Sequence, residues 1–213
     1  MSVDAIQLET GAKPEAAIIW LHGLGADGHD FEPIVPELRL KKPVRFVFPH
    51  APVRPVTINQ GMRMRAWYDI LQLGGGPEDE AGLRASQKIT EELIRAQGLP
   101  ANQVVLAGFS QGGAIVLQTA LRYPERLAGV VALSTYLPLA ATLAAERSAA
   151  NQGLPIFMGH GQYDDLIPLH RARASREHLE KLGYQIEWHD YPMAHSVCAP
   201  EIADLAAFLS KII

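Results

Sequence analysis

The residues best suited to chemistry lie in the segment GFSQG, residues 108–112, where a serine has a glycine two positions away on each side. The preceding VVLAG is an apolar run typical of a strand, and the following GGAIVLQTAL is typical of a helix. A strand, a tight turn and a helix in direct succession form the junction that holds a nucleophilic serine in a strained turn. The glycines leave room where a Cβ would meet neighbouring backbone. We therefore predict that Ser110 is a nucleophile.

The serine hydroxyl needs a general base, because unassisted it is a poor nucleophile at neutral pH. The chain has eight histidines, and the strand–turn–helix arrangement requires the base to follow the acid, near the chain end. His195, in YPMAHS, follows the last predicted strand and meets this condition. His160 precedes the candidate acids, and His189 lies inside a predicted strand. The order along the chain therefore favours His195 as the base.

The carboxylate that orients the imidazole is expected in the loop after the fifth predicted strand. Two acids compete there, Asp164 and Asp165 in GHGQYDDLIP. Spacing alone does not separate them, since one could orient the imidazole while the other caps the following helix or faces solvent. Asp190 is a weaker candidate, because it lies in the strand that leads to the predicted base.

An oxyanion needs at least two donors, and two loops supply candidates. One donor is the backbone N–H of Gln111, directly after the serine, and the other is the N–H of Leu24 in the loop HGLG, residues 22–25. The same loop also matches the dinucleotide-binding pattern G-x-G-x-x-G from Gly23 to Gly28. That alternative calls for an acid at the end of a second strand about 20 residues further on, where this chain has FVFPHAP. We therefore expect the loop to bind an oxyanion.

The elements that must position these residues alternate along the chain. Continuous apolar runs predict strands covered on both faces at residues 16–23, 44–52, 104–110, 127–134, 154–161 and 184–192. Helical patterns lie between and after them at residues 78–98, from Gly112 to Pro124, and at 171–184 and 201–213. Strands that alternate with helices predict an α/β fold with a mostly parallel sheet. One stretch, residues 54–76, lacks steady periodicity and is predicted to be a long functional loop.

Composition excludes several classes of protein. The 213 residues, 48% of them hydrophobic, suit a single domain spanning 1–213. The net charge of −4 and the absence of a Lys/Arg run argue against nucleic acid as a partner. The chain has neither a signal-peptide pattern nor an apolar run near the roughly 18 residues of a transmembrane segment, which favours a cytoplasmic protein. The histidines lack metal-ligand spacing, so we expect neither a metal nor an organic cofactor.

Five motifs carry a resemblance to a known family. LHGLGADG, RAWYDI, GFSQGG, GQYDDLIP and MAHS occur in an order and spacing that resembles the small carboxylesterases and acyl-protein thioesterases, a family of serine hydrolases in the α/β-hydrolase superfamily. The resemblance covers nearly the whole chain and looks closest to the bacterial carboxylesterases. It implies an α/β-hydrolase fold, with a doubly wound sheet, helices on both faces and no large lid domain.

Carried over position by position, the resemblance implies a nucleophile at Ser110, a base at His195 and an acid at Asp164. The position after the acid is often proline in the family, and here it is Asp165. The resemblance also implies an oxyanion hole formed by the backbone N–H groups of Leu24 and Gln111.

The resemblance further implies that the stretch around RAWYDI lines the acyl-binding site. Its apolar side chains are candidates for substrate contact, although each could equally be ordinary core: Trp67, Met62, Met64, Leu71 and Leu73. Trp67 is the best of them, because its neighbours Arg65 and Tyr68 indicate a partly exposed loop. Exposed apolar residues in this stretch would also permit a homodimer.

The expected activity is hydrolysis of carboxylic esters with short to medium acyl chains through an acyl-enzyme, acting on a small-molecule ester or thioester. The alternative is a lysophospholipase or acyl-protein thioesterase that acts on long acyl chains. A non-catalytic binding protein on the same scaffold usually lacks a triad member, whereas this chain has all three. Cys198 could also serve as a nucleophile beside His195, but it lacks an elbow, and we expect a buried free thiol.

Overall fold

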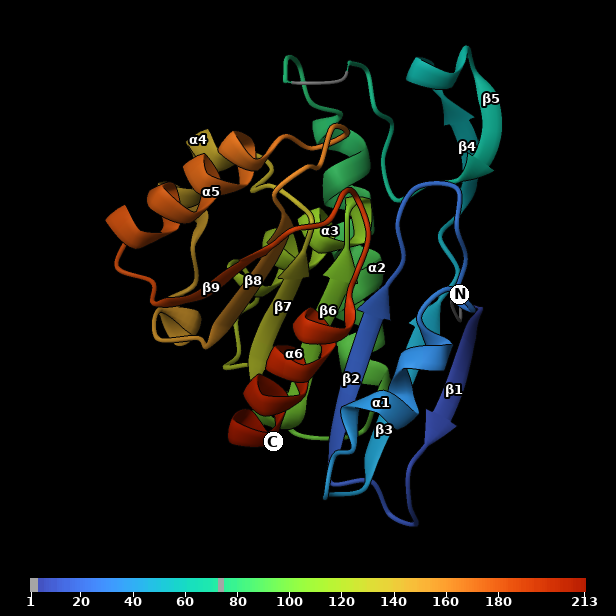
Figure 1. The fold of residues 1–213 in the computed structure, drawn as a ribbon, viewed down its shortest axis with the longest axis vertical. Coiled ribbons are helices and arrows are strands. Elements are labelled where there is room, and N and C mark those ends of the chain that lie inside the picture. Colours follow the sequence, from blue (N-terminus) through green and yellow to red (C-terminus); the bar gives the residue numbers. More distant parts are fainter. Residues whose placement is uncertain (1–3, 73–74) are drawn as a thin grey trace.

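A seven-stranded sheet forms the centre of the molecule, in a computed structural model that describes residues 4–72 and 75–213. Figure 1 shows its strands in the order β1-β3-β2-β6-β7-β8-β9. Their bounds are β1 (Ala5–Glu9), β2 (Ala16–Leu21), β3 (Val44–Pro49), β6 (Val104–Phe109), β7 (Gly129–Leu133), β8 (Ile156–Gly161) and β9 (Ile186–Tyr191). Strand β1 pairs antiparallel with β3, and the other pairings are parallel. The prediction of a mostly parallel sheet is confirmed.

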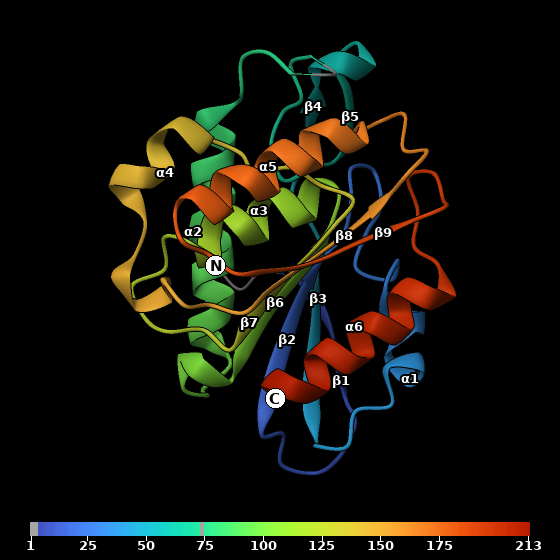
Figure 2. The ribbon, with the colours of Figure 1, turned by 60° about the vertical axis from the view of Figure 1, so that its left-hand side comes forward.

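Helices cover both faces of this sheet, as Figure 2 shows. Helices α1 (Val35–Leu38) and α6 (Ala199–Ile212) pack together on one face. The other face is covered by α2 (Glu80–Ala96), α3 (Gln111–Ala120), α4 (Ala140–Glu146) and α5 (Leu169–Lys181). Short 3₁₀ turns span Glu32–Ile34, Thr57–Asn59, Ala101–Gln103 and Ala149–Asn151. The doubly wound arrangement is therefore confirmed as well.

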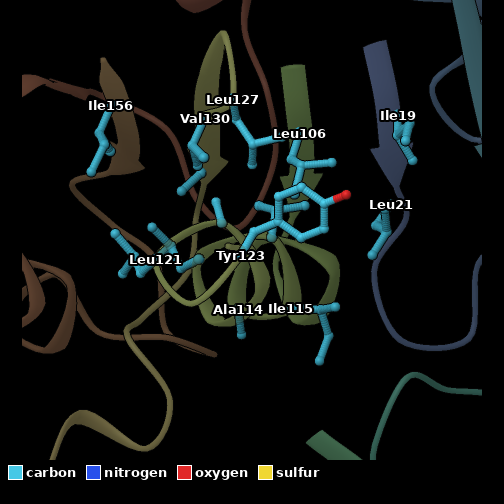
Figure 3. Packing of buried hydrophobic residues seen from close by; sticks show 14 of the residues in the cluster. Ile19, Leu21, Leu106, Ala114, Ile115, Leu121, Tyr123, Leu127, Val130 and Ile156 are labelled. Atoms are coloured by element: carbon cyan, nitrogen blue, oxygen red, sulfur yellow. The ribbon is translucent and has the colours of Figure 1, made fainter. Parts of the chain in front are cut away.

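The two faces of the sheet build two hydrophobic cores. Side chains alternate across a strand, so Ile19 and Leu21 of β2 join the core beneath α2 and α3, whereas Ile18 and Trp20 join the core beneath α1 and α6. Because both faces are buried, β2 is apolar at every position. Figure 3 shows part of the first core, in which four neighbouring strands contribute side chains over α3: Ile156, Val130, Leu106 and Ile19.

The order of the strands reverses at β2. The chain passes from β2 to β3 on one side, and β6 then pairs with β2 on the other side. The loops that leave the carboxyl ends of β2 and β6 therefore diverge and open a crevice, which is the usual place for a ligand in an open parallel sheet. The loop HGLG follows β2, and Ser110 follows β6.

The structure also contains elements that the sequence patterns did not predict. Residues 54–76 are not simply irregular, because they include most of an antiparallel hairpin of β4 (Val53–Val56) and β5 (Met62–Arg65). These strands read VRPV and MRMR, and most of their side chains are exposed or half-buried, so no apolar run marks them. Edge strand β1 and the short helices α1 and α4 were missed for a similar reason, since few turns and few buried residues define each of them.

Candidate active site

The turn at Ser110 has the backbone of a strained elbow. Its φ of 54° and ψ of −118° are rare for a residue with a side chain. The turn is held from both sides, since Ser110 N donates to Leu133 O at 2.8 Å and Thr135 Oγ1 donates to Ser110 O at 2.7 Å. A Cβ at Gly108 would lie 2.5 Å from the backbone carbon of Gly112, so the sharp bend needs glycine there. The surrounding structure thus maintains the strain and presents the serine hydroxyl.

The imidazole of His195 lies between the serine and a carboxylate. Its Nε2 is 2.9 Å from Ser110 Oγ, and its Nδ1 is 2.6 Å from Asp164 Oδ2. The ring also lies against Phe109, with ring centroids 4.8 Å apart. This geometry allows His195 to accept the serine proton through Nε2 while Nδ1–H donates to the carboxylate.

The two neighbouring aspartates occupy different environments. The side chain of Asp164 is buried, and its Oδ1 accepts hydrogen bonds from the backbone N–H groups of Leu166 (3.0 Å) and Ile167 (2.8 Å). Its Oδ2 is left to face His195. Asp165 is exposed to solvent. The loop therefore directs one carboxylate at the imidazole and the other at water.

A second histidine supports the loop of the acid. His160 is buried at the end of β8, and its Nε2 is 2.7 Å from Ile167 O and 3.5 Å from Asp164 Oδ2. Burial lowers the pKa of His160, which favours a neutral ring whose Nε2–H donates to the carbonyl. His160 thus supports the loop that contains Asp164 through its hydrogen bond to Ile167 O.

Two backbone N–H groups are available near the serine. Gln111 is the first residue of α3, so its N–H has no acceptor within that helix. In the loop after β2, Gly25 N donates to Arg65 O and Ala26 N donates to Gly23 O, while the N–H of Leu24 donates to none of the other described residues. Leu24 and Gln111 both line the cavity that contains Ser110. A negative charge in this cavity could therefore accept hydrogen bonds from both N–H groups.

The side chain of Gln111 has a structural role that sequence reasoning missed. Its Oε1 accepts a hydrogen bond from Trp67 N, and its Nε2 donates to Tyr68 O, both at 2.7 Å. The indole N–H of Trp67 in turn donates to His22 O at 2.9 Å. Gln111, directly after Ser110, and His22 therefore hold the segment around RAWYDI against the loops that follow β6 and β2. No spacing in the sequence marks this pairing.

Trp67 is 0% exposed, belongs to the core beneath α2 and α3, and does not line the cavity beside Ser110. Of the two alternatives for this side chain, its position is that of a core residue. Met62 is 65% exposed and, like Met64, does not line the cavity. Leu71 does line it, and Leu73 lies outside the described residues.

The cavity beside Ser110 has a volume of about 400 Å³. Five aliphatic side chains of its lining come from the segments before α2 and before α5: Ile58, Ile70, Leu71, Leu166 and Ile167. Two phenols also line it, with Tyr68 Oη 3.0 Å from Tyr136 Oη, and the guanidinium of Arg171 lies 4.0 Å from the centroid of the Tyr136 ring. Burial raises the pKa of both phenols, so they remain neutral hydroxyls.

A metal site and a membrane-spanning helix are both absent from the described ranges, residues 4–72 and 75–213. Within them, no three His, Cys, Asp or Glu side chains form a group that could hold a metal ion. Nor does any helix in these ranges have the length and apolarity required to span a bilayer.

Comparison with known proteins agrees with this geometry. Residues 4–213 match the model of the phospholipase/carboxylesterase family. Acyl-protein thioesterase 1 of Mycosarcoma maydis is 40% identical, over 98% of this chain and 95% of that protein. The crystal structure of Arabidopsis thaliana SOBER1 superposes with a TM-score of 0.87 at 30% identity, covering 92% of this chain and 98% of the other. Acyl-protein thioesterase 2 of Zea mays gives 0.86 at 25% identity, with 99% of both chains covered.

The family match spans nearly all of the chain. The sheet order, the strained turn at Ser110 and the position of His195 between Ser110 and Asp164 all fit this family. The chain therefore belongs to the phospholipase/carboxylesterase family and is a hydrolase with the α/β-hydrolase fold.

Proposed function

We propose that Ser110, His195 and Asp164 act as a catalytic triad that hydrolyses carboxylic esters and thioesters. The observation that carries the proposal is the position of the His195 ring, within hydrogen-bond distance of both Ser110 Oγ (2.9 Å) and Asp164 Oδ2 (2.6 Å). Such a chain of contacts is the recognised signature of an activated serine nucleophile. It opens onto a cavity large enough for a small substrate.

In the first step, Ser110 Oγ attacks the carbonyl carbon of the substrate while His195 Nε2 takes its proton. The tetrahedral intermediate then collapses, and the same nitrogen delivers that proton to the leaving alcohol or thiol. Water, deprotonated by His195, attacks the acyl-enzyme in the second step, and the proton returns to Ser110 as the acid product departs. Asp164 remains ionised throughout and stabilises the imidazolium.

The N–H groups of Leu24 and Gln111 would bind the oxyanion in both steps. A donor placed before the reaction begins needs no reorganisation when charge develops on the oxygen. The loss of one such donor typically raises the barrier by about 3 kcal/mol. A backbone donor cannot be removed by an ordinary substitution, so its contribution is best tested through the geometry of the turns that hold it.

We propose that short to medium acyl esters are the preferred substrates. A cavity of about 400 Å³ lies near the lower end of the range of about 300–1,000 Å³ that is usual for ligand sites. The alternative, a lysophospholipase or acyl-protein thioesterase that acts on long acyl chains, has comparable support, because the similar fungal and maize proteins are named acyl-protein thioesterases. In that case the chain would have to extend beyond the cavity, past the exposed Leu71 and Leu166 at its rim.

A fluorophosphonate probe tests the central claim. We expect the probe to label Ser110 of the wild-type protein, and we expect neither labelling nor esterase activity in Ser110→Ala. Ser148→Ala is a suitable control, because that serine lies outside the cavity and should not affect labelling. Full esterase activity in folded Ser110→Ala would exclude the proposed nucleophile.

A series of p-nitrophenyl esters and matched acyl thioesters with lengthening chains tests the substrate range. We expect kcat/KM to peak at a short or medium chain and then to fall. A steady rise towards palmitoyl, above all with the thioesters, would favour the long-chain alternative instead.

A further inference from the structure

A buried carboxyl group lies beside the catalytic loop but takes no part in the proposed chemistry. Glu201 is the third residue of α6, six positions after His195, and it is 0% exposed. Neither of its oxygens has a hydrogen-bond partner among the described residues. A carboxyl group in such a place is costly unless it serves the fold or the function.

The carboxyl group of Glu201 lies directly against strand β8. A Cβ at Gly159 would overlap its Oε1, so only glycine allows this approach. Two residues along the same strand, a Cβ at Gly161 would lie 2.5 Å from Met193 O and would also overlap Ala194 O. The segment from Met193 to Glu201 therefore contacts β8 at Gly159 and at Gly161, and His195 lies in the sequence between the residues that make these two contacts.

Strand β8 also contacts the loop that contains Asp164, the proposed acid of the triad. His160, next to Gly159, lies 3.5 Å from Asp164 Oδ2, and Gly159 O accepts a hydrogen bond from Ser134 N at 2.8 Å. Gly159, which Glu201 contacts, therefore also bonds to Ser134 after β7, and its neighbour His160 contacts the loop of Asp164. A small movement of α6 away from this strand would shift His195 relative to its two partners.

No ion pair within the described residues includes Glu201. The titratable groups of the elements packed around it are Asp204 and Lys211 of α6, Glu187, His189, Asp190 and Tyr191 of β9, His160 of β8, and His195 and Cys198 of the preceding loop. Lys211, near the other end of α6, pairs with Glu187 at 3.4 Å. Asp204 Oδ2 accepts from Tyr191 Oη at 2.9 Å and lies 3.6 Å from His189 Nδ1. From α1, the facing side chains are the apolar Val35 and Leu38, while Glu37 is exposed.

Burial and the nearby Asp204 raise the pKa of Glu201 to about 8. The N–H of Cys198 opposes this shift, but its position does not satisfy the geometry of a full hydrogen bond. At neutral pH the folded protein therefore holds a neutral carboxylic acid at this place. Ionisation would bury an uncompensated charge, and hydrating that charge requires the first turn of α6 to leave β8.

We propose that Glu201 is a positioning residue for His195, whose neutral carboxyl group keeps the start of α6, and with it the catalytic loop, seated on β8. The proposal rests on the proposed role of His195 as the base. It predicts that at alkaline pH, when Glu201 ionises, His195 moves out of reach of Ser110 while the chain stays folded.

The rate at which a fluorophosphonate labels Ser110 measures this seating, because the reaction needs the serine and the base in contact. For wild-type protein we expect the second-order rate constant at pH 9 to be about tenfold below its value at pH 7, since about one molecule in ten would keep the proton. Glu201→Gln and Glu201→Met fill the same space without titrating, and we expect less than a twofold change over that range. Near-ultraviolet circular dichroism at each pH shows whether the protein is folded.

Glu177→Gln is the control, since it removes an exposed carboxylate from another helix, α5, and should leave the alkaline decline in place. A decline like that of the wild type in either folded Glu201 variant would overturn the proposal, because a purely structural Glu201 would change the melting temperature and not the pH profile. A wild-type rate constant that does not fall by pH 9 would overturn it too. Absence of labelling at pH 7 would instead contradict the proposed function.

Discussion

At the scale of single residues, the two neighbouring aspartates provide the sharpest test of the site. Asp164 is buried 2.6 Å from His195 Nδ1, whereas Asp165 is exposed. We expect Asp164→Asn to lower kcat by about 10⁴-fold, because an amide cannot hold the imidazole in the required tautomer. Asp165→Asn should keep nearly full activity. Measurement of kcat/KM on one p-nitrophenyl ester compares them, and equal losses would refute the assignment of the acid.

Gln111 should matter for stability as well as for catalysis. Truncation to alanine would leave Trp67 N–H and Tyr68 C=O buried without partners, since both now bond to its side chain. We expect Gln111→Ala to lower the free energy of unfolding by about 2–4 kcal/mol, measured by urea denaturation. Gln103→Ala, at an exposed position, serves as the control. Equal stability of the two variants would mean that the clamp contributes little.

The contrast between Ser110 and Trp67 shows how far single residues can be predicted. The serine could be predicted because its flanking glycines, strand and helix all constrain the same turn, and chain order favours His195 as the base. Chain order does not separate Asp164 from Asp165, and only the resemblance to the family favours Asp164. The burial of Trp67 could not be found, because an aromatic residue between Arg65 and Tyr68 reads as a mixed loop. Its direction is set by hydrogen bonds to Gln111 and His22, which are distant in the sequence.

At the scale of elements, the junction between β6 and α3 depends on close backbone contact. A Cβ at Gly112 would overlap Leu21 O at the end of β2, and it would lie 2.7 Å from His22 O. Backbone atoms in a central strand cannot move aside cheaply, so Gly112→Ala should destabilise the protein by about 3 kcal/mol and abolish labelling of Ser110.

Gly153→Ala is the comparison variant, because its nearest neighbour would be Arg126 Nη1 at 3.6 Å, the end of a flexible side chain. Thermal unfolding of both variants measures the difference. A Gly112→Ala protein as stable as Gly153→Ala would show that the elbow tolerates a side chain.

Elements with continuous apolar runs were predicted well, because burial on both faces leaves a clear mark in the sequence. The hairpin of β4 and β5 carries no such mark, since Pro55, Arg63 and Arg65 interrupt any apolar pattern. Helix α4 begins after Leu139, whose φ of 45° is a conformation that no propensity would suggest for leucine. Tertiary contacts, rather than local preference, determine these pieces.

At the scale of the whole molecule, we propose that residues 1–213 form a single domain. The first and last strands, β1 and β9, are the two edges of one sheet, so neither half of the chain can complete a core alone. We expect one cooperative unfolding transition, with fluorescence and circular dichroism giving the same midpoint. Two separated transitions would contradict a single domain.

The buried Glu201 should also tie global stability to pH. Its pKa rises from 4.5 when unfolded to about 8 when folded, so the folded state binds the proton more tightly. The stability from this group is therefore full below pH 4.5 and is lost as pH rises to 8, by an amount on the order of 4–5 kcal/mol.

Glu201→Gln removes this dependence. The free energy of unfolding of the variant, relative to wild type, should therefore increase steadily from pH 5 to pH 8. Urea denaturation at several pH values measures the difference. A constant difference across this range would mean that Glu201 does not retain its proton in the folded state.

The site is also spread along the chain in a particular order: Leu24, Ser110, Asp164 and then His195. A ribosome therefore releases the proposed nucleophile long before the base, and β9 and α6, which place that base, come last. A nascent chain that ends before residue 195 carries the proposed nucleophile without the proposed base. We therefore expect products that terminate before residue 195 to show no esterase activity.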